Sequence, residues 1–186
     1  MNKPIGLTLC ALLALCSWGL LVGATPHQEP PPAETRAIAL IVHPDNPMEN
    51  VEFTRLRGYL KLGHKFWPGT KTPFVLLLPA AQSESKQVLN ELVYRMDEAR
   101  LAKYWTGLIH AGKIPRPPQE VRTTAAAGRM VAASVGAISA VPADEVPEGV
   151  RVLQIDGFAP GEKGYPLTYE PETPPEGVSA ATNSRS

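Results

Sequence analysis

Two short runs of consecutive apolar residues constrain the fold of this chain more than any other feature. They are Ala37–Val42 (AIALIV) and Phe74–Leu78 (FVLLL), and a proline follows each run within two residues. A strand with one face in water alternates apolar and polar residues, whereas a strand covered on both faces is apolar throughout. Both runs are therefore predicted to be strands of a sheet that has helices on both of its faces.

Segments in which apolar residues recur at helical spacing separate these strands from two more short apolar runs, Ala137–Val141 and Val150–Ile155. This alternation predicts an α/β domain with three layers, whose four strands share one largely parallel sheet. The predicted helices are 50–63 with Asn50 as its cap, about 85–96 with Ser83 or Ser85 as its cap, 98–110 with Asp97 as its cap, and about 124–135 with Thr123 or Thr124 as its cap and Gly136 at its end. We expect Leu92 and Trp105 in the core.

Composition divides the chain into four segments. Residues 1–24 are predicted to be a signal peptide, 25–36 a proline-rich linker, 37–167 the folded domain and 168–186 a disordered tail. The linker and the tail are assigned on their prolines and polar residues and on the lack of any apolar periodicity.

The signal peptide has Lys3, an apolar run and the small residues Val22-Gly23-Ala24, after which cleavage is expected. The chain is then exported to the periplasm and keeps no stable membrane span. The alternatives are an uncleaved anchor and a lipoprotein modified at Cys16, although Leu15 stands where a small residue is expected. Both cysteines, Cys10 and Cys16, lie in this segment, so the mature chain has no thiol.

Charge and motifs exclude several classes of function. The chain has 18 basic and 18 acidic residues, and a nucleic-acid partner would require a basic surface to neutralise phosphates. The four histidines are scattered singly, and the motifs of zinc proteases, serine hydrolases, nucleotide-binding loops and dinucleotide-binding folds are absent. The sequence therefore predicts no enzyme, no cofactor and no metal site.

The most informative candidate site is the turn Pro79–Lys86 (PAAQSESK), where a buried strand leads directly into a helix. Ligands of open α/β sheets lie at the carboxyl ends of strands, and a helix N-terminus offers free N–H groups to an anion. Ser83, Ser85 and Lys86 are the predicted ligand-binding residues, for phosphate or another oxyanion. The alternative is that a serine only caps the helix, and Glu84 is unfavourable beside an anion.

Four motifs in order resemble one family. They are IALIVHPDNP (38–47), FTRLRGYLKLGHKFWPG (53–69), VAASVGAISAVPADEVPEGVRVLQIDG (131–157) and GYPL (164–167). Together they resemble the substrate-binding proteins of phosphate ABC transporters, which have a type 2 periplasmic-binding-protein fold of two lobes around a phosphate. The resemblance implies that this chain corresponds to the second lobe only.

The resemblance also has departures at the anion loop. Leu78 stands where the family has an arginine, the loop glycines are lost, and Ser139-Ala140 replaces a Gly-Tyr pair. The expected function is an exported, non-catalytic binding module with a weak site for phosphate or another oxyanion, whose cleft a partner protein completes. The alternative is a structural or protein-interaction module that has lost the ligand.

Overall fold

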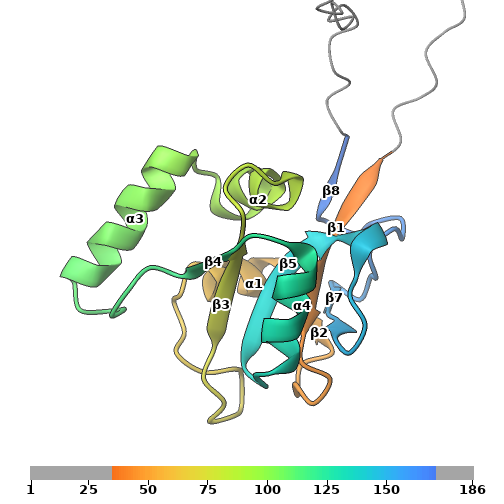
Figure 1. Ribbon diagram of the computed structural model, residues 1–186, viewed down its shortest axis with the longest axis horizontal. Coiled ribbons are helices and arrows are strands. Elements are labelled where there is room, and N and C mark those ends of the chain that lie inside the picture. Colours follow the sequence, from red (N-terminus) through yellow and green to blue (C-terminus); the bar gives the residue numbers. More distant parts are fainter. Residues whose placement is uncertain (1–34, 171–186) are drawn as a thin grey trace, which may run out of the picture. The chain divides into compact units, whose positions relative to one another are not determined.

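A computed structural model describes residues 35–170, in which strands and helices largely alternate along the chain (Figure 1). The strands are β1 (Arg36–Val42), β2 (Asn50–Val51), β3 (Val75–Pro79), β4 (Gln119–Val121), β5 (Ala137–Pro142), β6 (Arg151–Val152), β7 (Gln154–Ile155) and β8 (Thr168–Tyr169). The helices are α1 (Phe53–Leu60), α2 (Glu84–Val88) with its π-helical continuation η1 (Leu89–Tyr94), α3 (Glu98–His110), α4 (Thr124–Ala132) and the 3-10 turn η2 (Ala143–Glu145).

The main sheet has the strand order β4-β3-β5-β1-β6, and β8 pairs with the same edge of β1 as β6 does. β3 is parallel to β4 and to β5, whereas β1 is antiparallel to β5, β6 and β8. Five of the six strands therefore run in one direction and β1 opposes them. The predicted α/β class and largely parallel sheet are confirmed, with β1 as the exception.

Both faces of this sheet are buried, as the two apolar runs predicted. In β1, Ile38, Leu40 and Val42 belong to one core cluster, and Ala39 and Ile41 belong to another on the opposite face. Because successive side chains of a strand point to opposite faces, one run of apolar residues supplies both clusters.

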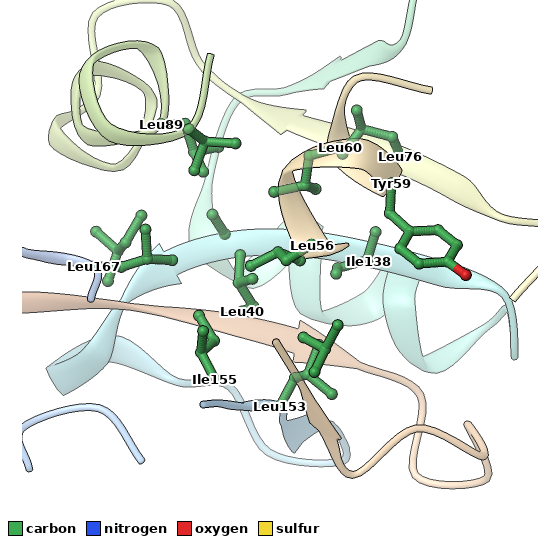
Figure 2. Close-up of a cluster of buried hydrophobic side chains, with 14 of the residues drawn as sticks. Leu40, Leu56, Tyr59, Leu60, Leu76, Leu89, Ile138, Leu153, Ile155 and Leu167 are labelled. Carbon is green, nitrogen blue, oxygen red and sulfur yellow. The ribbon is translucent and has the colours of Figure 1, made fainter. Parts of the chain in front are cut away.

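Helices cover the two clusters from opposite sides, which completes the three layers. The larger cluster is covered by α1, α2, η1 and α3, and Figure 2 shows Leu56 and Leu60 of α1 packed against Leu40 of β1 and Ile138 of β5. The smaller cluster is covered by α4 through Ala127 and Val131.

The segment 150–155 differs from its prediction as a single strand of the main sheet. Arg151–Val152 pairs with β1, but Gln154–Ile155 pairs in parallel with β2 to form a separate two-stranded sheet. Between them the buried Leu153 donates its N–H to the carbonyl of Leu40, 2.8 Å away. The chain thus crosses from one sheet to the other within a run that contains no turn residue.

The predicted helices are present, and some of their ends are corrected. Glu52 rather than Asn50 precedes α1, because Asn50 belongs to β2 and its side chain accepts a hydrogen bond from the Gly157 N–H. α4 ends at Ala132 rather than near Val135. Trp105 is buried as predicted, whereas Leu92 is only half-buried at the edge of the core.

The boundaries of the domain shift slightly. Arg36, assigned to the linker, pairs with Tyr169, and Ala37 pairs with Thr168, so that the first two residues of the expected tail form a strand. The predicted signal peptide, residues 1–24, lies outside the described residues, as do the linker up to residue 34 and the tail from residue 171.

Candidate functional site

A cavity of about 550 Å³ lies where three strands of the main sheet end at their carboxyl termini. Pro79 of β3, Val121 of β4 and Pro142 of β5 contribute to its wall. The first turns of α2 and α4 form two further sides of the cavity, together with Glu145 of η2. This is the edge of an open α/β sheet at which ligands are expected.

The α2 side of the cavity begins with Ser83, which caps the helix. Its Oγ accepts the Lys86 N–H at 3.2 Å and donates to the carbonyl of Ala80 at 2.7 Å. Both of its local hydrogen-bonding roles are therefore filled within the chain. Of the two serines that the sequence offered as a cap, the structure assigns this role to Ser83.

Ser85 lines the same cavity and has a different environment. The residue is 2% exposed, and its Oγ has no hydrogen-bond partner within residues 35–170. A buried hydroxyl without a partner costs free energy, so it is a feature that calls for an explanation such as a ligand.

Lys86 is turned away from this cavity. Its Nζ lies 3.0 Å from Glu98 of α3 and 3.7 Å from Glu120 of β4, and its side chain is 1% exposed. Burial raises the pKa of Glu98, but hydrogen bonds from Asn90 and Lys86 and the charge of Lys86 outweigh this effect, so the pKa lies below its ordinary value. The ammonium group predicted as an anion ligand thus joins α2, α3 and β4 instead.

The α4 side of the cavity contains Arg122, Thr123 and Thr124. Thr123 is the cap of α4, and its side chain accepts the Ala126 N–H at 3.2 Å. Thr124 is the first residue of the helix, and its hydroxyl donates to Glu145 Oε2 at 2.9 Å. A second helix N-terminus therefore borders the cavity opposite the one that the sequence identified.

The sequence interpretation missed this second side because β4 has no apolar run. Its residues are Gln119, Glu120 and Val121, of which only the last is buried. The usable signal was Arg-Thr-Thr at 122–124 before an alanine-rich helix, which, like Ser-Glu-Ser-Lys at 83–86, places two hydroxyls and a cation at a helix start, although in the opposite order.

Glu84 connects the cavity to the strand pair β1–β8. Its carboxylate accepts a hydrogen bond of 2.5 Å from the Tyr169 hydroxyl, and Arg36 lies 3.9 Å away. Burial, together with the hydrogen bond and charge of Glu84, raises the pKa of Tyr169 to about 12. The tyrosine therefore stays protonated at neutral pH and acts as the donor.

The groups that line the cavity offer hydrogen-bond donors to a small oxyanion. The first N–H groups of each helix have no acceptor within the helix, and the Ser85 hydroxyl and Arg122 add further donors. Within residues 35–170 no three His, Cys, Asp or Glu side chains gather as metal ligands would, and no helix is both long and apolar enough to cross a membrane. Glu84 and Glu145 oppose an anion by their charge.

Comparison with solved structures identifies the fold. An ABC-type phosphate transport receptor from Vibrio cholerae superposes with a TM-score of 0.54 at 17% identity, over 68% of this chain and 48% of the receptor. PstS from Borrelia burgdorferi gives 0.56 at 14% identity, over 73% and 55%. A structure from Clostridium perfringens, described as a phosphate ABC transporter substrate-binding protein with bound phosphate, gives 0.53 at 18%, over 67% and 47%.

The chain therefore spans about half the length of the solved structures that it matches. At these identities the likeness concerns the fold, and at that level it confirms the resemblance drawn from the four sequence motifs. No protein-family model and no curated protein matches the sequence.

Proposed function

We propose that this chain is an exported, non-catalytic binding module that binds phosphate or a related oxyanion weakly in the cavity between α2 and α4. The observation that carries the proposal is the meeting of two helix N-termini at the carboxyl ends of three strands. Helix N-termini favour anions through their free N–H groups and the helix dipole. The fold shared with phosphate receptors supports the same ligand class.

Ser85 is the side chain that gains most from such a ligand. Its buried hydroxyl has no partner in the described part of the chain, and an oxyanion at the first turn of α2 would accept its hydrogen bond. Arg122 supplies the positive charge that the sequence prediction had assigned to Lys86.

The affinity is expected to be about millimolar, near −4 kcal/mol. Both Arg122 and Glu145 are exposed, so water screens the attraction between the cavity and an anion. A partner protein that covers the cavity would exclude this water and tighten binding.

The alternative function is a structural or protein-interaction module without a ligand. Two observations favour it: Lys86 is held by Glu98, and two carboxylates line the cavity. In that case the partner recognises the surface of the domain rather than a cavity occupied by an anion.

Titration of the exported form with phosphate, followed by amide NMR shifts, separates these functions. We expect the amides of Glu84, Ser85, Thr124 and Ala125 to shift together at millimolar phosphate, with sodium chloride at equal ionic strength as the reference. Arg122→Gln should weaken the response, while Arg129→Gln, which removes a charge from α4 outside the cavity, should not. Amides that stay unchanged at tens of millimolar phosphate would contradict oxyanion binding and favour the interaction module.

A further inference from the structure

Glu145 lies beside the first turn of α4, on the wall of the cavity. Its carboxylate accepts the Thr124 hydroxyl hydrogen bond at 2.9 Å, and both residues line the cavity. The first turn of α4 has no acidic residue of its own, whereas α2 has Glu84 and α3 has Glu98 in theirs. The acidic side chain at the start of α4 thus comes from η2, 21 residues further along the chain.

The two carboxylates of the cavity differ in how their charges are balanced. The Glu84 carboxylate accepts a hydrogen bond from the Tyr169 hydroxyl and lies near the Arg36 guanidinium group. Glu145 has the Thr124 hydroxyl as its partner, and none of the ion pairs formed within residues 35–170 includes it. Its charge is therefore the less compensated of the two.

The opposite side of the cavity carries an independent sign that a further group belongs there. Ser85 belongs to α2, is almost fully buried, and has a hydroxyl for which the described chain offers no partner. The Thr124 hydroxyl on the α4 side has Glu145 as its acceptor, whereas the Ser85 hydroxyl on the α2 side has none within residues 35–170.

We infer that Glu145 is the residue that sets the affinity of this cavity, because its carboxylate lies beside the first turn of α4, holds the Thr124 hydroxyl and repels an oxyanion that enters the cavity. This inference rests on the proposed function and identifies the residue that keeps binding weak. A glutamine at 145 keeps an oxygen that can accept the Thr124 hydrogen bond and loses the charge that repels a second anion.

The test compares Glu145→Gln with Glu148→Gln in the same protein. Glu148 is exposed, lies three residues further along and does not line the cavity, so the second variant makes the same change in net charge. We expect the dissociation constant for inorganic phosphate to fall on the order of tenfold in Glu145→Gln and to stay unchanged in Glu148→Gln. Equal affinity in the wild type and Glu145→Gln would overturn the inference and leave the proposed function intact.

A second measurement needs no ligand. In the phosphate-free protein, the Thr124 and Ala125 amides should shift in Glu145→Gln and not in Glu148→Gln, because the first change removes a negative charge beside the start of α4. Unchanged amides would overturn the inference. If phosphate binds to Glu145→Gln alone, the inference is supported and the proposed function of the wild type fails.

Discussion

Ser83 and Ser85 lie two residues apart, and their hydroxyls have opposite environments. Ser83 Oγ makes two hydrogen bonds that start α2, whereas Ser85 Oγ makes none within residues 35–170. We expect Ser83→Ala to destabilise the protein by about 1 kcal/mol through the lost cap. Ser85→Ala should change stability by less than about 0.5 kcal/mol, because alanine removes an unsatisfied group.

Urea denaturation of both variants checks this prediction, and phosphate titration gives it a second readout. Ser85→Ala should weaken phosphate binding without loss of stability. An equal loss of stability in the two variants would mean that Ser85 has a structural partner.

The ion pair of Lys86 and Glu98 predicts how stability depends on acid. The pKa of Glu98 is lower in the folded protein than its ordinary value of 4.5, so the pair stabilises the fold fully above that pH. This contribution is lost as the pH falls below 4.5 and through the folded-state pKa. Glu98→Gln should therefore be less stable than the wild type at pH 7. Between pH 7 and pH 3.5 it should lose less stability than the wild type does.

Urea midpoints at the two pH values measure this difference. Glu91→Gln is the matched control, because Glu91 is an exposed carboxylate of η1 in no ion pair of the described region. If Glu98→Gln and Glu91→Gln both lose as much stability in acid as the wild type, the ion pair of Glu98 with Lys86 does not cause the acid dependence of stability.

At the residue scale, local sequence was sufficient for three of the four predicted caps, with Asn50 as the exception, and insufficient for the partners of charged side chains. Asp97 was predicted to cap α3, and its side chain accepts the Arg100 N–H as expected. Lys86 was assigned to the anion site because it follows two serines, but its side-chain partners are 12 and 34 positions away. Nothing in the neighbouring residues indicates such distant partners.

Among the elements, the entry into β5 depends on one glycine. Gly136 accepts hydrogen bonds at its carbonyl from the Val75 N–H and from Trp67 Nε1, both at 2.9 Å. This close approach leaves no room for a side chain, since a Cβ there would overlap the carbonyl oxygen of Pro73. The sequence interpretation used this glycine as a helix end, and the structure shows that it joins β5 to the preceding turn.

A pair of glycine substitutions tests this explanation. Gly136→Ala should destabilise the protein by about 3 kcal/mol, near the upper end for overpacking. Gly107 lies near the end of α3 with open space around it, and Gly107→Ala should stabilise the protein by about 0.5–1 kcal/mol through helix propensity. Thermal or urea unfolding measures both. Tolerance of alanine at 136 would mean that the Pro73 backbone can move aside.

The sequence predicts the strands and helices that have an apolar run or a helical repeat of apolar residues. It does not predict the short strands that form only because a neighbouring strand pairs with them. β1, β3 and β5 carry apolar runs, and α3 has a stripe of buried residues on one side. β2, β4, β7 and β8 have two or three residues each and exist because a neighbouring strand pairs with them. Pairing of this kind leaves no periodic signal in the sequence.

For the molecule as a whole, β8 fastens the end of the described chain to its beginning. Its two residues pair with Arg36 and Ala37, and Tyr169 donates a hydrogen bond to Glu84 of α2. A chain that ends at Leu167 should therefore be less stable than one that ends at Glu170, by about 1–3 kcal/mol for the lost hydrogen bonds.

Urea unfolding of the two truncated chains measures this difference, with Tyr169→Phe in the longer chain to isolate the bond to Glu84. Equal stability of the two chains would show that β8 contributes nothing to the fold.

The fold class and layering followed from the sequence, while the direction of β1 did not. Apolar runs indicate that strands are buried on both faces but say nothing of the direction in which they run. The pairing of Ile38 with Pro142 shows the direction of β1. The start of β1 lies beside the end of β5, so the two strands are antiparallel.

The antiparallel pairing of β1 with β8 also makes this domain suitable as a graft. Residues 36 and 169 are direct partners, so their Cα atoms lie on the order of 5 Å apart. A protein that received residues 36–169 within one surface loop would need to open that loop by only this distance. We therefore expect that the segment between these positions can be transplanted as a single cassette, in which the cavity between α2 and α4 can be studied apart from the rest of the chain.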